Sequence, residues 1–258
     1  MPYREEIYIV RDENKKIIYQ EKSKYFSLRV GGKKTRIKNT NETPDWMKVA
    51  NQKRKEKKLS RLIQTNFTRD DIYLTLTYAE EPEFEEGKKK LQKFLRTLRR
   101  RYKKKDWELK YIYRTEYRGH RLHHHLIIND PTHGEVRRRD IQNLWKEGMI
   151  NHYSFQRYDG EHEDAKRLAA YFCKESKKQI QQQKEKQAWH PSRNLKKPEI
   201  HHRTIRSKKW KEKPVPPAGM ELIEVINTYT TWGYPMQIAK YRKRGRQKYE
   251  DTGGTYWT

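Results

Sequence analysis

Residues 110–129 have the sequence KYIYRTEYRGHRLHHHLIIN, in which two runs rich in aromatic and aliphatic residues flank an Arg-Gly-His segment. Runs of this composition predict two β-strands, at 110–117 and 122–129. Glycine at the first central position of a two-residue loop favours a type II′ turn, so we expect Gly119 and His120 to join the two strands. The segment therefore predicts an antiparallel β-hairpin.

The expected hairpin gathers ionisable side chains on one face. Side chains alternate between the faces of a strand, so His123 and His125 point the same way and His124 points the other way. A two-residue loop also places Glu116 directly across from His123, with their Cβ atoms about 4.5–5.5 Å apart. Three successive histidines alone would more often form a partly exposed polar strand. With the facing carboxylate, Glu116, His123 and His125 predict a divalent metal site that keeps positions open for a substrate oxygen.

The elements around the hairpin predict an α+β fold. A strand begins at Ile72, and apolar residues at helical spacing predict a helix over 88–105. Another helix begins near 43–45, where Thr-Pro-Asp provides a start signal. Downstream we expect a helix around 140–147, a strand over 151–158 and a helix over 163–178. From residue 72 to residue 178 the order of elements is β-α-β-β-α-β-α, which is typical of a ferredoxin-like, split βαβ antiparallel sheet flanked by helices.

The charge of the chain indicates an acidic partner. Lys and Arg number 61 against 34 Asp and Glu among 258 residues, a formal net charge of +27. The aromatic content of 12% is unlike that of an intrinsically disordered chain, so we expect a folded protein that binds nucleic acid. The helices over 48–61 and 88–105 are the expected phosphate-contacting surfaces. The expected DNA contacts are Arg54, Arg61, Arg99, Arg100, Lys103, Arg167 and Lys178.

Several classes of protein are disfavoured. The single cysteine, Cys173, provides neither an internal disulfide nor a thiolate zinc cluster. We find no apolar run of transmembrane length and no secretory signal, which favours a cytoplasmic protein that does not bind membranes. The phosphate-binding pattern G-x-x-x-x-G-K-[ST] is missing, so we expect no helicase activity in this chain.

The helix over 163–178 contains a candidate nucleophile, Tyr171. Helical periodicity places four apolar residues on one face: Ala165, Leu168, Ala169 and Phe172. Tyr171 falls in a sector away from that face, together with Arg167, Lys174 and Lys178. Neighbouring cations stabilise the ionised form of a tyrosine, which is the form that attacks phosphorus. Without the metal hairpin, a tyrosine at a core boundary beside a solvated basic face would be the simpler interpretation.

Three motifs in this order resemble those of HUH endonucleases. They are Leu74-Thr75-Leu76-Thr77, Glu116 with His123 and His125, and Tyr171 with Lys174. Among these enzymes, the sequence looks most like the replication-associated (Rep) proteins of rolling-circle phages and small bacterial replicons, with the resemblance covering about residues 45–180.

The sequence departs from this pattern at two positions. His124 stands between the two expected metal ligands, where an apolar residue is usual, and this could weaken packing on the opposite face of the strand. Glu175 stands where relatives with two tyrosines carry the second nucleophile. The resemblance is therefore to a single-tyrosine enzyme.

The resemblance implies the HUH endonuclease fold and a rolling-circle replication initiator that nicks and transfers single-stranded DNA at an origin. Tyr171 would form a 5′-phosphotyrosine intermediate, and Lys174 would stabilise developing negative charge. Mg or Mn would be bound by Glu116, His123 and His125. A helicase and a polymerase of the bacterial host would be partners, with no small-molecule substrate. The sequence leaves the general base for Tyr171 open.

Two alternatives remain. The first is a single-tyrosine transposase or relaxase-like enzyme, which would share the same motifs. The second is a non-enzymatic single-stranded nucleic-acid-binding protein, in which exposed tyrosines of the sheet stack on bases. The tyrosines expected to do so are Tyr73, Tyr111 and Tyr113.

The composition along the chain suggests four regions. Residues 1–42 form an N-terminal β-hairpin region and residues 43–180 the endonuclease domain. Residues 181–242 are an extension of uncertain fold that includes a candidate strand, MELIEVINTY. Residues 243–258 are expected to be a disordered tail.

Overall fold

The computed structural model describes residues 2–12, 15–24, 43–68, 70–118, 121–132, 141–154, 162–174, 188–207, 209–230 and 233–244. Within these ranges the protein is α+β, with two antiparallel sheets and three helices. The chain divides into two compact units. The terminal unit comprises Met1–Ile9, Glu13–Lys33 and Glu199–Thr258, and the central unit comprises Val10–Asp12 and Lys34–Pro198.

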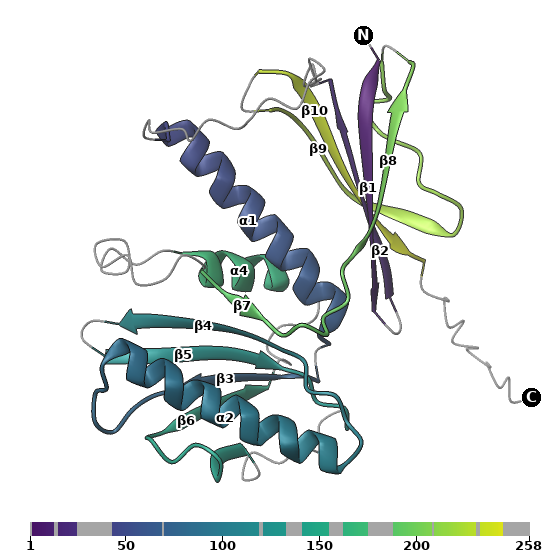
Figure 1. Ribbon diagram of the computed structural model, residues 1–258. Helices are drawn as coiled ribbons and strands as arrows, with labels where there is room; N and C mark the ends of the chain where they lie inside the picture. Colours follow the sequence, from purple (N-terminus) through teal and green to yellow (C-terminus); the bar gives the residue numbers. More distant parts are fainter. Residues whose placement is uncertain are drawn as a thin grey trace, which may run out of the picture. The chain divides into compact units, whose positions relative to one another are not determined.

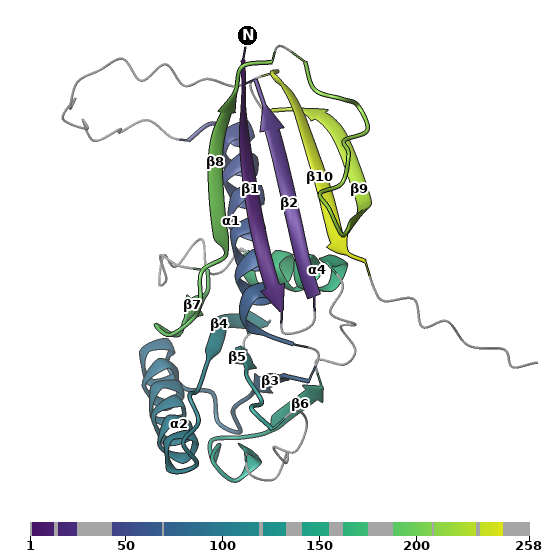
Figure 2. The ribbon, with the colours of Figure 1, turned by 90° about the vertical axis from the view of Figure 1, so that its right-hand side faces the viewer.

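The terminal unit is built on a five-stranded sheet with the order β8-β1-β2-β10-β9 (Figure 2). Its strands are β1 (Tyr3–Asp12), β2 (Lys15–Ser23), β8 (Glu199–Ile205), β9 (Met220–Tyr229) and β10 (Pro235–Lys243). The N-terminal hairpin thus pairs with strands from the far end of the chain. The candidate strand MELIEVINTY is confirmed as β9.

The central unit contains a second five-stranded sheet with the order β6-β3-β5-β4-β7. Its elements are α1 (Asp45–Asn66), β3 (Ile72–Leu76), α2 (Phe84–Lys104), β4 (Tyr111–Arg118), β5 (Arg121–Ile128), β6 (Ile150–Ser154), α4 (His162–Cys173) and β7 (His190–Pro191). Strand β5 lies between β3 and β4, the two strands that α2 connects. Figure 1 shows α2 on one side of this sheet and α4 on the other.

The predicted elements of the central unit are largely present. Helix α2 begins at Phe84, four residues earlier than expected. An added Cβ at Gly87 would lie 2.3 Å from a methyl carbon of Leu122, so this glycine lets the first turn of α2 approach β5 closely. Of the helix expected around 140–147, only residues 141–142 are helical among those described, and residues 155–161 and 175–187 lie outside the described ranges.

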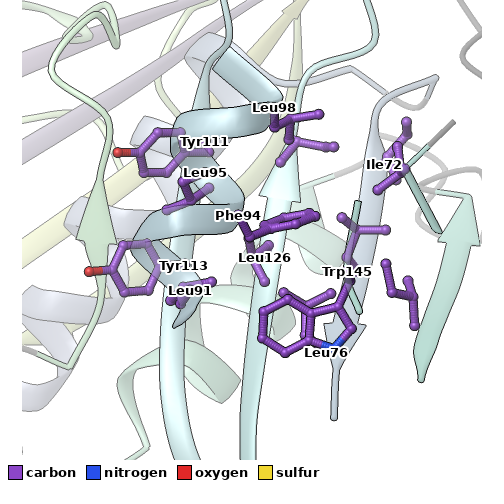
Figure 3. Close-up of a cluster of buried hydrophobic side chains, with 14 of the residues drawn as sticks. Ile72, Leu76, Leu91, Phe94, Leu95, Leu98, Tyr111, Tyr113, Leu126 and Trp145 are labelled. Carbon is purple, nitrogen blue, oxygen red and sulfur yellow. The ribbon is translucent and has the colours of Figure 1, made fainter. Parts of the chain in front are cut away.

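Each face of the central sheet has its own hydrophobic core. On one face, α2 packs its apolar stripe over β3, β4 and β5, and this core includes Leu76, Leu126 and Trp145 (Figure 3). On the other face, α1 and α4 pack against Tyr73, Ile112 and Ile127. Burying one such side chain contributes about 1.5–3 kcal/mol relative to leaving it exposed. Because alternate residues of each strand supply the two cores, the register of the sheet is strongly specified.

His124 belongs to the α2 face, where it is fully buried. Its Nε2 lies 2.7 Å from the Tyr78 hydroxyl and its Nδ1 lies 2.9 Å from Thr115 Oγ1. The Tyr78 hydroxyl donates its proton to the carbonyl of Gly87, so Nε2 of His124 donates and Nδ1 accepts. Burial lowers the pKa of His124 to about 3, which keeps the ring neutral. The polar residue is therefore accommodated by hydrogen bonds rather than weakening the packing.

The expectation of exposed, base-stacking tyrosines on the sheet is wrong. Tyr73, Tyr111 and Tyr113 are only 8%, 9% and 5% exposed. Tyr73 is covered by the core under α1 and α4, whereas Tyr111 and Tyr113 are covered by the core under α2. Helices on both faces leave no open aromatic platform at these three positions.

Candidate active site

The hairpin register is as predicted from the turn. Strands β4 and β5 pair Arg118 with Arg121 and Glu116 with His123. The loop residues 119–120 themselves lie outside the described ranges. Glu116, His123 and His125 therefore share the sheet face that α1 and α4 cover, and His124 lies on the opposite face.

Three functional groups meet at one point on this face. The Tyr171 hydroxyl of α4 lies 2.5 Å from Glu116 Oε1 and 2.9 Å from His125 Nε2. Glu116 Oε1 and His125 Nε2 are themselves 2.9 Å apart. Glu116 and His125 are buried, whereas Tyr171 is 37% exposed and can be reached from solvent. The structure thus brings the candidate nucleophile against two of the candidate metal ligands.

The other side of the His125 ring is held by β3. Its Nδ1 lies 2.9 Å from the Tyr73 hydroxyl and 3.2 Å from Thr75 Oγ1. Thr75 pairs with His125 in the sheet and belongs to the Leu-Thr-Leu-Thr motif. These contacts fix the plane of the ring and direct Nε2 towards Glu116 and Tyr171.

His123 lies beside this group. Its ring is nearly parallel to that of His125, with an interplanar angle of 10° and 6.5 Å between ring centroids. Its Nδ1 lies 2.9 Å from the Arg121 carbonyl oxygen, which can only accept, so Nδ1 is the donor in this hydrogen bond. Such a hydrogen bond to a backbone carbonyl is typical of histidines that bind metal through the other nitrogen.

Glu116, His123 and His125 suit a divalent ion, because their donor atoms are of the right type and they share one face of the sheet. Two imidazole nitrogens and a carboxylate oxygen are donors that such an ion accepts. In the part of the chain that the structure describes, no three His, Cys, Asp or Glu side chains converge closely enough to hold one ion. Ligation by all three residues would therefore require a side-chain rotation, which the partly exposed His123 can make most easily.

A residue that the sequence analysis missed, Arg114, completes the site. Its guanidinium lies 3.0 Å from Glu116 Oε2, donates to the Tyr171 carbonyl oxygen, and stands over the Tyr171 ring at 5.7 Å. Arg114 is 2% exposed, so these interactions are shielded from water. One side chain therefore connects the carboxylate with the backbone of the candidate nucleophile. The alternation of side chains along β4 could have identified Arg114 from the sequence, because residue 114 lies on the same sheet face as residue 116 and pairs with His125.

Glu116 is held in its ionised form. Burial raises the pKa of its carboxyl, but the hydrogen bonds with His125 and Tyr171 and the charge of Arg114 outweigh that effect. The pKa accordingly falls to about 2. The carboxylate can therefore accept the phenol hydrogen or bind a cation throughout the neutral range.

An open groove of about 560 Å³ borders the candidate nucleophile. Gln52 and Glu56 of α1 line it together with Ala170, Tyr171 and Lys174. Gln52 Nε2 donates to the Cys173 carbonyl at 2.9 Å, which fixes the end of α4 against α1. Lys174 directly follows α4 and is exposed, so its charge lies beside the same groove.

The predicted DNA contacts are dispersed over the central unit. Arg54 and Arg167 are exposed on α1 and α4, whereas Arg99, Arg100 and Lys103 are exposed on α2, across the sheet from Tyr171. Lys178 lies outside the described ranges.

Arg61 differs from the expectation of a surface contact. It is only 7% exposed, because it lies in a stretch of α1 where Leu59, Ser60, Ile63 and Gln64 are buried as well. A buried guanidinium does not offer a surface for DNA phosphates.

The comparisons with known proteins concern the same central part of the chain. Residues 71–180 match the family model of replication-associated protein ORF2/G2P. The matched segment covers less than half of the 258 residues and contains β3 to α4, with Arg114, Glu116, His123, His125 and Tyr171 but without the groove residues of α1. The central part of the chain is thus similar to replication-associated proteins, and this similarity supports a role in DNA replication. No curated protein and no solved structure shows significant similarity to the chain.

Among the helices of the described residues, none is both long and apolar enough to cross a bilayer.

Proposed function

We propose that the protein is a replication initiator that nicks and rejoins single-stranded DNA through Tyr171. The observation that carries this proposal is the convergence of the Tyr171 hydroxyl with Glu116 Oε1 at 2.5 Å and with His125 Nε2 at 2.9 Å. A tyrosine whose oxygen meets a carboxylate and an imidazole at a solvent-accessible point is arranged for nucleophilic chemistry.

Two further observations support the HUH endonuclease class. Four adjacent strands of the central sheet have the order β6-β3-β5-β4. When these four strands are numbered from 1 to 4 in chain order, the order in the sheet is 4-1-3-2, as expected for a ferredoxin-like split βαβ sheet. The matched family is described as replication-associated, which favours an initiator over a transposase or relaxase. The burial of Tyr73, Tyr111 and Tyr113 removes the specific argument for a non-enzymatic base-stacking module.

The cofactor in this proposal is a divalent ion, Mg or Mn, held by Glu116, His123 and His125. When bound, it would act as a Lewis acid towards the scissile phosphate. Tyr73 and Thr75 orient His125 for this role, and Arg114 fixes the rotamer of Glu116.

The covalent step follows from the position of Tyr171. Its oxygen attacks phosphorus, and the bond between phosphorus and the 3′ oxygen breaks. This leaves a 5′-phosphotyrosyl protein and a free 3′-hydroxyl end. The phenol loses one proton and the departing 3′ oxygen gains one, so the reaction is balanced. Arg114 and Gln52 hold the last turn of α4, and thus the attacking oxygen, in place. Lys174 beside the groove stabilises negative charge on the phosphate.

Tyr171→Phe tests this proposal, because it keeps the ring and removes only the attacking oxygen. Wild-type protein incubated with single-stranded oligonucleotides from its own replicon and Mn should form an adduct that survives a denaturing gel. The Tyr171→Phe variant should form none while binding the oligonucleotides as before. Tyr229→Phe, at an exposed tyrosine of β9, is the matched control and should behave like wild type. An adduct that persists in Tyr171→Phe overturns the assignment of the nucleophile.

A further inference from the structure

We propose that the exposed face of α2 binds duplex DNA, on the side of the central sheet opposite Tyr171. The inference rests on the proposed function only in taking DNA as the substrate. It adds a second DNA surface that the cleavage chemistry does not use.

After its first turn, which carries Glu85 and Glu86, the exposed face of α2 is positively charged. Residues 88–105 contain eleven Lys or Arg and no Asp or Glu. Exposed cations recur at intervals of three and four residues and therefore form one stripe along the helix. The stripe comprises Lys89, Lys93, Arg96, Arg100 and Lys103. At 1.5 Å per residue it is about 21 Å long, which corresponds to about six base pairs of duplex.

Packing against the sheet fixes the orientation of α2 and therefore of this stripe. Its apolar positions, including Leu91, Leu95 and Leu98, are buried at 2% exposure or less against the sheet. The cations therefore project from a helix whose orientation is fixed by the core beneath it. A straight, rigid row of positive charge matches the regular phosphate backbone of a duplex.

The composition of α2 favours duplex over single-stranded DNA. Surfaces for single strands combine positive charge with exposed aromatic side chains on which bases stack. Phe84, Phe94 and Tyr102 are the aromatic residues of α2, and all three are at most 4% exposed. The exposed face thus offers phosphate contacts without a stacking platform, which is the chemistry of backbone recognition.

The sheet separates this stripe from the candidate active site. Helix α2 covers the face that contains Leu74 and Leu126, whereas Glu116, His125 and Tyr171 lie on the face covered by α1 and α4. The two surfaces therefore face away from each other. A duplex flank on α2 and a single strand at Tyr171 can therefore be bound at the same time, as an enzyme that nicks beside a melted region requires.

A variant with Lys89, Lys93, Arg96 and a further exposed cation of α2, Lys104, all changed to Gln tests the inference, because Gln preserves helix propensity. A matched control changes four exposed lysines of the terminal unit to Gln, namely Lys209, Lys211, Lys213 and Lys243. Both variants lose four charges. Affinity for a blunt 20-base-pair duplex is measured across a salt series, and the rate of cleavage is measured on a short single-stranded oligonucleotide.

We expect the α2 variant to lose duplex affinity and its slope of log K against log salt to flatten by about 0.9 per lost contact, up to about 3.6. The control should keep the wild-type slope, and both should cleave the single strand within about twofold of wild type. An unchanged slope in the α2 variant, or an equal loss in the control, overturns the inference. A parallel loss of single-strand cleavage would assign α2 to the cleaved strand instead. If wild type cleaves nothing, the proposed function fails, but the duplex measurement still decides this inference.

Discussion

Replacing His124 with alanine should destabilise the protein without removing its chemistry. The ring is fully buried beneath α2 and hydrogen-bonds to Tyr78 and Thr115. Truncating a buried side chain of this size costs about 2–4 kcal/mol through lost contacts and the cavity left behind. Losing the hydrogen bonds inside the core adds about 1–3 kcal/mol. We therefore expect the free energy of unfolding to fall by about 3–7 kcal/mol, a large part of the 5–15 kcal/mol typical of a domain.

Two further variants separate the loss of packing from the loss of hydrogen bonds and compare the two faces of β5. His124→Phe refills the volume of the ring but makes neither hydrogen bond, so it should cost only about 1–3 kcal/mol. His123→Ala changes a partly exposed side chain on the other face and should cost less than about 1 kcal/mol. Urea unfolding followed by circular dichroism measures all three values. At low temperature, where folded His124→Ala remains, its cleavage should approach that of wild type. If His124→Ala is no more destabilising than His123→Ala, the assignment of the two faces is incorrect.

Three other expectations follow from the same geometry. His123→Ala and His125→Ala should each abolish divalent-dependent cleavage while low-salt DNA binding stays within about twofold of wild type; equal loss of cleavage in folded His124→Ala would contradict the parity argument. Lys174→Ala should slow adduct formation in a time course without preventing it, because it removes charge stabilisation and not the attacking oxygen; complete loss would give Lys174 a more direct role. The folded-state pKa of His124, about 3, lies below the ordinary value of 6.5, so the unfolded chain takes up the proton first and stability should fall as pH decreases from about 6.5 towards 3. Thermal melts across that range should show a weaker pH dependence in His124→Phe.

The features that the sequence predicted correctly are local ones. The two-residue spacing between Arg118 and Arg121 and the two-residue period of a strand determine that Glu116 faces His123 and that His124 points away. The stripe of Leu91, Leu95 and Leu98 determines the buried face of α2. These relations depend on residues a few positions apart and need no knowledge of the tertiary fold.

The features that the sequence did not reveal depend on how distant elements pack. The contact between Tyr171 and Glu116 spans 55 positions and exists only because α4 docks on the face that carries the carboxylate. Burial of Tyr111 likewise depends on which helix covers which face. Arg114 was one of 61 basic residues, and the hydrogen bond that distinguishes it, to the Tyr171 carbonyl oxygen, exists only when α4 is docked. The pairing of β1 with β8 joins positions nearly 200 residues apart, which no local pattern encodes.

The Tyr171 hydroxyl oxygen is proposed to form the covalent bond between the protein and the DNA phosphate. The most direct measurement is peptide mass mapping of the adduct formed by wild-type protein with a cleavable single-stranded oligonucleotide and Mn. We predict that the nucleotide mass lies on the peptide containing Tyr171, attached through a 5′ phosphate. A mass on a peptide with another tyrosine, such as Tyr153 or Tyr158, or no adduct with any origin-derived strand, would contradict it.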